Sequence, residues 1–235
     1  MPESHTVDVD AGESVAAVHH AAATDDWLFF CHGFLSDKAG SYESRCERAV
    51  EEGYNAVRFD FRGSGESDGS FVDQHLSDRI ADLECVVDHF DPDSYSLFGS
   101  SFGAKVALHA AVDDDRVDAV IGRAPVTYNR SFDEYRTLAE DEGTLVIDDA
   151  HAIDRSFFDD LDRHRFAVVA SALDVPVALF HGRADDSVPL SDSLDAAEAL
   201  EPAVLIQTYP SECHRFSRAA ESRMRRQLFD WLALV

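Results

Sequence analysis

Short apolar runs alternate with helical patterns along most of the chain. Trp27 to Cys31 is continuously apolar, which is typical of a strand covered on both faces. Six further strand-like runs are Ser14 to His19, Tyr54 to Phe61, Tyr95 to Phe98, Val117 to Ile121, Val175 to Phe180 and Val204 to Tyr209. The alternation predicts an α/β fold, with a mostly parallel sheet between two layers of helices.

Helical periodicity fills the segments between these strands. The expected helices are Gly40 to Glu52, Ser77 to Phe90, Phe102 to Val112 and Ser217 to Leu234. The second has Ile80, Leu83, Val87 and Phe90 on one face, and Asp91-Pro92 ends it. In the last helix we expect Met224, Leu228, Trp231 and Val235 to face inward.

The regular alternation breaks between Arg123 and Ala170, where charge is scattered and apolar runs are short. Long loop-rich stretches inside a compact domain are usually functional. We therefore expect a small cap insertion at about 124–170, and the alternative is a surface excursion without a role. Phe157, Phe158 and Phe166 are candidates to line a pocket there, although simple packing explains aromatic residues equally well.

Length and composition are those of one globular domain spanning 1–235. The chain has 235 residues, 45% of them hydrophobic, and a formal net charge of −26. So much apolar content argues against disorder, and so acidic a chain is unsuited to nucleic acid or anionic membranes. The arginines between Arg218 and Arg226 are interpreted as the solvated face of a helix.

Several further features bear on where the protein works. No run approaches the ~20 apolar residues that span a bilayer, and Met1 to Asp10 has no signal-peptide pattern, so a cytoplasmic protein without membrane partners is expected. Its four cysteines form no CxxC, which favours buried thiols over disulfides or zinc. Only two lysines occur, and 31 of the 46 acids are Asp, a composition that resembles proteins of extreme halophiles.

Gly99-Ser100-Ser101-Phe102-Gly103 fits the pattern GxSxG between an expected strand and an expected helix. A sharp strand-to-helix turn at this motif presents the middle hydroxyl above the sheet edge. Ser101 is therefore the candidate nucleophile. Because a serine hydroxyl is a poor nucleophile at neutral pH, it needs a base and an acid that orients the base.

Asp185 and His214 follow Ser101 in the chain order that this motif requires. Both lie in loops after expected strands, where open α/β sheets place their sites. Asp186 competes with Asp185 as the acid. His75 competes as the base, whereas the other histidines are interpreted as solvated or packed.

Four blocks of sequence together resemble the α/β-hydrolase superfamily. They are His32-Gly33-Phe34, Asp60 to Ser67, the GxSxG motif, and His181 to Pro189 with His214. Gly65 to Phe71 and the short insertion are similar to small serine esterases of the cinnamoyl or feruloyl type and to serine aminopeptidase-like relatives.

The resemblance implies a serine hydrolase acting on a small or medium carboxylic ester. Ser101 would attack the carbonyl, His214 would transfer the proton, Asp185 would orient the imidazole, and the N–H groups of Phe34 and Phe102 would bind the oxyanion. No cofactor or metal is expected, since dinucleotide, P-loop and zinc patterns fail on inspection. The alternatives are a thioesterase or aminopeptidase on the same triad, and a non-catalytic ligand-binding protein.

Overall fold

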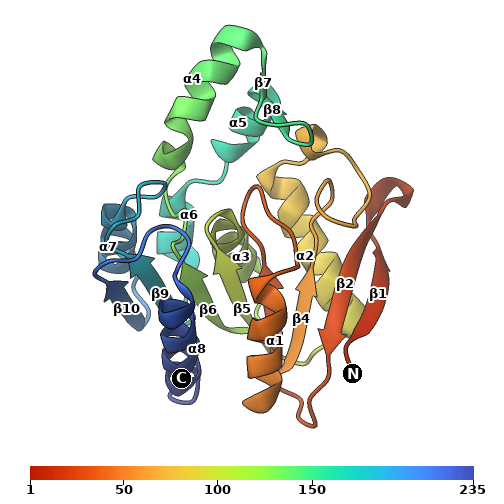
Figure 1. Cartoon of the computed structure of the whole chain (residues 1–235), viewed down its shortest axis with the longest axis vertical. Helices are drawn as coiled ribbons and strands as arrows, with labels where there is room; N and C mark the ends of the chain where they lie inside the picture. Colours follow the sequence, from red (N-terminus) through yellow and green to blue (C-terminus); the bar gives the residue numbers. More distant parts are fainter.

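A single eight-stranded sheet forms the centre of the molecule (Figure 1). The computed structural model describes residues 1–235, apart from the side chain of Ala11. In spatial order the strands are β1 (Glu3–Asp8), β2 (Ser14–His20), β4 (Asn55–Phe59), β3 (Trp27–Cys31), β5 (Tyr95–Ser100), β6 (Val117–Arg123), β9 (Val177–Gly182) and β10 (Val204–Tyr209). β2 is antiparallel to β1 and β4, and the other neighbours are parallel. The predicted α/β fold is confirmed.

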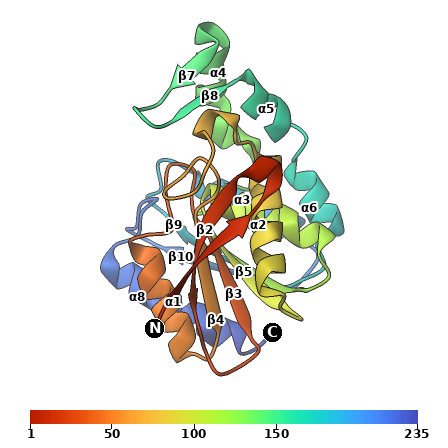
Figure 2. The ribbon, with the colours of Figure 1, turned by 90° about the vertical axis from the view of Figure 1, so that its right-hand side faces the viewer.

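Helices cover both faces of the sheet (Figure 2). They are α1 (Ser41–Glu51), α2 (Leu76–Phe90), α3 (Phe102–Asp113), α6 (Phe166–Ala172), α7 (Leu190–Ala199) and α8 (Arg218–Leu232). α1 and α8 lie on one face, and α2, α3 and α6 lie on the other. The 3-10 turns are η1 (Asp10–Gly12), η2 (Phe71–Asp73) and η3 (Asn129–Phe132). No helix of the described chain is long and apolar enough to cross a membrane.

The two faces of the sheet bury separate apolar clusters. Successive side chains of a strand point to opposite faces, so in β3 Leu28 and Phe30 join the cluster beneath α1 and α8. Phe29 and Cys31 join the larger cluster on the side of α2 and α3. This double burial explains why the strand is apolar at every position. It also fixes the carboxyl ends of the parallel strands as a rigid rim.

The segment after β6 is more regular than its sequence indicates. It contains α4 (Asp133–Glu142), the two-stranded sheet of β7 (Thr144–Val146) and β8 (Ala152–Asp154), and α5 (Arg155–Leu161). These elements rise above the carboxyl ends of the central strands (Figure 1). α6 instead contacts α3 and α7, so the end of the expected insertion packs against the body of the domain.

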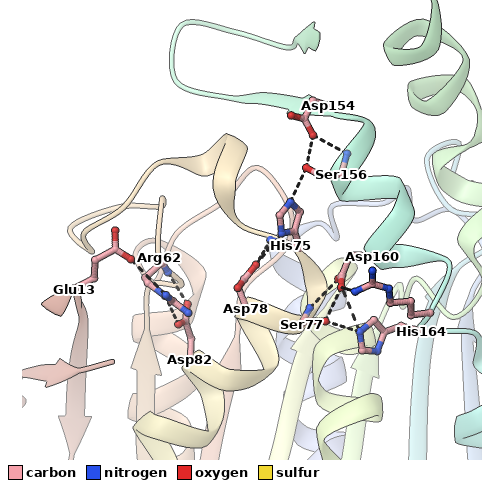
Figure 3. A network of polar contacts seen from close by, with 11 residues as sticks. Glu13, Arg62, His75, Ser77, Asp78, Asp82, Asp154, Ser156, Asp160 and His164 are labelled. Atoms are coloured by element: carbon pink, nitrogen blue, oxygen red, sulfur yellow. Dashed lines mark hydrogen bonds and ion pairs between the residues drawn. The ribbon is translucent and has the colours of Figure 1, made fainter. Parts of the chain in front are cut away.

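Hydrogen bonds tie this insertion to the start of α2 (Figure 3). The ring nitrogen Nε2 of His75 lies 2.9 Å from the Ser156 hydroxyl. The Ser77 hydroxyl donates to Asp160 Oδ1 at 2.6 Å, and the Ser77 amide donates to the other carboxylate oxygen at 3.0 Å. Because the Asp160 carboxylate is nearly buried, this contact fastens α5 to the body of the domain.

A few expectations about single elements were wrong or incomplete. β1 was not foreseen because only its Val7 is buried, as suits an edge strand. α7 was missed because acidic residues interrupt its apolar face. In α8, Val235 lies beyond the helix and is exposed, and Trp231 is half-buried, while Phe229 and Leu232 take the buried positions.

Candidate active site

Ser101 stands at a sharp turn between β5 and α3. Its backbone angles are φ 53° and ψ −116°, in the left-handed region that a side chain disfavours. The flanking glycines make the turn possible. A Cβ at Gly99 would lie 2.3 Å from the Ala104 backbone, and a Cβ at Gly103 would lie 2.3 Å from the Cys31 carbonyl oxygen. The GxSxG pattern therefore reflects backbone crowding on both sides of the serine.

The amides of Phe34 and Phe102 flank this turn, and neither donates a hydrogen bond within the described chain. Phe102 begins α3, where an amide has no partner inside the helix. Phe34 follows β3 in a loop fixed by His32. Nδ1 of His32 lies 2.8 Å from the Gly33 carbonyl, and the Phe61 amide donates to Nε2 at 3.1 Å. Burial lowers the pKa of His32 to about 3, so this ring is neutral.

Asp185 and His214 contact each other directly. The Nδ1 atom of His214 lies 2.9 Å from Asp185 Oδ2. Their loops are joined by backbone hydrogen bonds, including one of 3.0 Å from the Ala184 amide to the Glu212 carbonyl. A Cβ at Gly182 would lie 2.2 Å from that same carbonyl oxygen. Glycine at 182 is thus what allows the two loops to approach.

The carboxylate of Asp185 is fully buried and saturated with donors. The amides of Ser187 and Val188 both donate to Oδ1 at 2.9 Å. On Oδ2, Nε2 of His181 lies 3.2 Å away, beside His214. Burial disfavours the ionised form, but the hydrogen bonds from His181, His214 and Val188 outweigh it and hold the pKa of Asp185 below its usual range.

Ser101 and His214 line the same cavity, together with Gly33 and Phe34. The Ser101 hydroxyl and the His214 imidazole form no hydrogen bond in the described structure. Asp186 also lines the cavity but is exposed, and His214 forms its ion pair with Asp185 instead.

His75 lies elsewhere. It caps α2, with Nδ1 3.0 Å from Asp78 Oδ2, and it contacts the insertion through Ser156. It does not belong to the cavity lining, in contrast to its candidacy as a base. Chain order favours His214, because His75 precedes Ser101, but the sequence alone did not exclude His75.

The cavity has a volume of about 1190 Å³ and two unlike ends. An aromatic end is formed by Phe34, Phe132 and Tyr135, whose rings pack against one another. Phe132 and Tyr135 come from the segment after β6. Phe157, Phe158 and Phe166, the candidates from sequence, do not line the cavity but are buried in the core behind it.

An arginine end, which sequence reasoning missed, is formed by Arg45, Arg123 and Arg225, which gather around Glu221; Arg215 and Arg218 also line the cavity. Arg225 is half-buried and donates to the Ser44 carbonyl at 2.7 Å, so the expectation of a solvated arginine face on the last helix was wrong for this residue. Positive charge is scarce in so acidic a chain, and this scarcity was the one sequence signal that could have directed attention to the arginines. The fold brings together arginines that lie far apart in the sequence.

Cysteine and metal chemistry add little to this site. Cys31 and Cys46 are buried and free, as expected, whereas Cys213 is exposed and lines the cavity beside His214. Among the described side chains, no group of three or more His, Cys, Asp or Glu is placed to hold a metal ion.

Fold and sequence comparisons place this arrangement in a known class, and the molecule is an α/β hydrolase. The mouse α/β hydrolase domain-containing protein 10 superposes with a TM-score of 0.87 at 23% identity, covering 98% of both chains. Est1E from Butyrivibrio proteoclasticus, solved with ferulic acid, superposes with a TM-score of 0.86 at 20% identity, covering 97% of this chain and 98% of Est1E. At such identities the likeness establishes the fold.

Within this class, the chain belongs to the family described as "Serine aminopeptidase, S33", whose model matches residues 22–141. That match includes Ser101 but ends before Asp185 and His214. The human "Palmitoyl-protein thioesterase ABHD10, mitochondrial" is 27% identical over 185 residues, which cover 73% of this chain. The aligned region spans 60% of the human protein's length.

Proposed function

We propose that this chain is a serine hydrolase that cleaves a small or medium carboxylic ester through an acyl-enzyme intermediate. The observation that carries the proposal is the position of Ser101, on a left-handed turn in a cavity that it shares with His214. The Nδ1 atom of His214 is held by the buried Asp185 carboxylate. A strained nucleophile, a base and an orienting acid are the groups that activate a serine.

In the proposed mechanism, the Nδ1–H group of His214 donates a hydrogen bond to Asp185, so that Nε2 carries the lone pair that serves as the base. As the Ser101 Oγ bonds to the substrate carbonyl carbon, its proton passes to Nε2. The Oγ–Nε2 hydrogen bond must form for this step, and such bonds often tighten only when substrate is present. The imidazolium then protonates the leaving oxygen, the ester C–O bond breaks, and water repeats the sequence on the acyl-enzyme.

Negative charge that develops on the carbonyl oxygen would be met by the amides of Phe34 and Phe102. Both are free of partners in the described chain, and both follow strands of the rigid rim. Removing one such donor from a comparable site costs ~2.7 to 4 kcal/mol of barrier. The neutral, buried His32 ring keeps the Phe34 loop in place.

We also propose that 1–235 is one hydrolase domain in which the segment at about 124–170 covers the site. Ser131, Phe132 and Tyr135 of this segment line the cavity, which supports the proposal. The partner is a small-molecule ester, and no cofactor takes part in the steps above. The cytoplasmic location expected from sequence stays a prediction.

A thioester is the second candidate substrate, because relatives such as the human protein named above are palmitoyl-protein thioesterases. The same groups would serve, with a thiolate in place of the leaving alkoxide. An aminopeptidase fits less well. Its substrate carries a free ammonium group, whereas five arginines line this cavity.

Replacement of the nucleophile tests the proposal. Ser101→Ala should lower kcat for p-nitrophenyl butyrate in concentrated salt by about 10⁶-fold, the loss seen in a comparable triad, and should abolish labelling by a fluorophosphonate. Ser131→Ala is the matched control, since its hydroxyl belongs to the same cavity and has no partner. Near-normal turnover by Ser101→Ala, or an unlabelled native protein, would favour a non-catalytic binding protein instead.

A further inference from the structure

Positive charge gathers in the cavity of a protein whose net charge is −26. Five arginines line the cavity, but only three carboxylates do, those of Asp37, Asp186 and Glu221. The chain has 46 acidic residues against 20 basic ones. A cavity lined by more arginines than carboxylates is therefore the reverse of the composition of the whole chain.

Arg123 contacts the Ser101 turn directly, because the Ser101 amide donates to the Arg123 carbonyl oxygen at 2.9 Å. Its side chain is 9% exposed. Nη1 donates to the His214 carbonyl and Nε to the Ser100 hydroxyl. The remaining nitrogen, Nη2, has no hydrogen-bond partner among the described residues, so one donor of a nearly buried cation in the cavity wall is free.

Arg45 and Arg225 complete this end of the cavity from α1 and α8. Arg45 is 4% exposed, and its Nε donates to Glu221 at 2.6 Å. Glu221 is the half-buried carboxylate of this region. Burial raises its pKa, but Arg45, Arg123 and Arg225 outweigh burial and lower the pKa below its usual value. One carboxylate thus faces three guanidinium groups.

This arrangement of buried cations costs folding free energy. Arg45 Nη1 and Arg123 Nε approach the same Ser100 hydroxyl, at 3.3 and 3.2 Å, which brings two buried like charges together. Burial, followed by repulsion from Arg45, lowers the pKa of Arg123 to about 10. Buried charge is retained where a partner neutralises it, and of these two arginines only Arg45 forms an ion pair with Glu221.

We propose that the arginine end binds a carboxylate carried by the substrate, so that the enzyme prefers esters with an anionic acyl or alcohol part. This inference rests on the proposed function. A guanidinium is suited to the task, because its planar donors match the two oxygens of a carboxylate. Gly40 and Ser41, at the start of α1, line the same cavity, and the positive end of the helix dipole adds to the attraction.

Matched pairs of esters, each measured at constant ionic strength, test the preference on both sides of the bond. On the acyl side the pair is mono-p-nitrophenyl glutarate against p-nitrophenyl pentanoate, and on the alcohol side it is 4-acetoxybenzoate against phenyl acetate. The readout is the ratio of kcat/KM, anionic over neutral. A purely structural role for the arginines would move both members of a pair together and leave the ratio unchanged.

The variants Arg123→Gln and Arg225→Gln should lower this ratio about ten- to a hundredfold on at least one side, as expected for loss of a charged hydrogen bond. Arg226→Gln is the matched control, since this substitution removes the same charge. Arg226 is the exposed neighbour on α8 and does not line the cavity. Its ratio should stay within about twofold of the native value. If Arg123→Gln fails to fold, Arg225→Gln and Arg123→Lys carry the test.

Two failures are distinguishable. If neutral esters are cleaved in a Ser101-dependent way but the ratio is unchanged in Arg225→Gln and the Arg123 variant on both sides, the carboxylate site is refuted and the serine hydrolase stands. If no ester of either kind is cleaved in a Ser101-dependent way, the proposed function fails and this inference fails with it.

Discussion

The two ends of the cavity differ in what they present and in which part of the chain builds them. Arg45, Arg123 and Arg225 come from α1, β6 and α8, elements packed on the central sheet. Phe132 and Tyr135 come from the insertion that follows β6. The arginines are thus supplied by the body of the domain, whereas two of the three rings of the aromatic end are supplied by the insertion. The two preferences can therefore be altered separately by mutation.

An arginine is also present behind the aromatic end, but it is sealed from the cavity. Arg79 is 0% exposed, and its guanidinium lies 5.1 to 6.0 Å from the ring centres of Phe34, Phe61, Phe71 and Phe102. Such contacts are cation–π interactions. The contrast with Arg123 shows that the position of a buried cation relative to the cavity, rather than its burial, decides whether it can meet a substrate.

The largest expected effect is a loss of kcat that is the same for substrates bound by either end of the cavity. Asp185→Asn should lower kcat about 10⁴-fold for anionic and neutral esters alike, because the imidazole loses its orienting carboxylate. Steady-state kinetics on the ester pairs measure this. Asp186→Asn is the control, since its carboxylate does not contact His214, and it should stay near the native rate. A large loss in Asp186→Asn with a small one in Asp185→Asn would transfer the role to the neighbour.

The same variant has a signature in stability. The pKa of Asp185 is depressed in the folded protein by the hydrogen bonds it accepts. Its ionised form therefore stabilises the fold above the unfolded pKa of ~3.9, and this contribution is lost as pH falls below that value. Denaturant unfolding between about pH 4 and pH 2 should show a shallower pH dependence in Asp185→Asn than in the native protein.

A smaller effect should be confined to the aromatic end. Tyr135→Ala removes a half-buried ring that contacts Phe34 and Phe132. We expect kcat/KM for p-nitrophenyl benzoate to fall about three- to tenfold relative to p-nitrophenyl acetate, with the anionic-to-neutral ratio unchanged. Tyr128→Ala, whose ring packs on Phe166 away from the cavity, is the control. A changed charge ratio in Tyr135→Ala would contradict the separation of the two ends.

The smallest effect on catalysis is expected from the contact that ties the insertion to α2, where a substitution should change stability instead (Figure 3). Ser77→Ala leaves the nearly buried Asp160 without its 2.6 Å donor, which should lower the free energy of unfolding by ~1 to 3 kcal/mol. Ser171→Ala, an exposed hydroxyl bonded only to the Val168 carbonyl, should change it by less than ~0.5 kcal/mol. Urea titration measures both. Equal losses in the two variants would show that the contact does not fasten the insertion.

Much of this architecture could be predicted from local patterns. Continuous apolar runs predict buried strands such as β3 and β9. The GxSxG motif identifies Ser101, because backbone crowding requires glycine on both sides of the turn. Asp185 and His214 were expected from chain order, and the structure brings them within 2.9 Å. Such features depend on a few neighbouring residues or on chain order, so they can be predicted from the sequence.

Other features depend on distant contacts and were not foreseen. Arg45, Arg123 and Arg225 meet only because α1, β6 and α8 converge on one cavity. In the insertion, α4 buries only Ala139, so its periodicity is weak. Phe157 of α5 packs against Phe34 and does not line the cavity. Edge strand β1 lacks an apolar alternation because Val7 is its only buried residue.

The buried ring of His32 has a practical consequence for kinetics. Its pKa of about 3 lies outside the range in which hydrolases are assayed, so the loop that carries the Phe34 amide keeps one protonation state from weak acid to alkali. A sigmoidal acid limb in a pH–rate profile would consequently report on the general base and not on loss of the anion-stabilising loop. The pH dependence of the rate can therefore be assigned to the general base without a correction for His32.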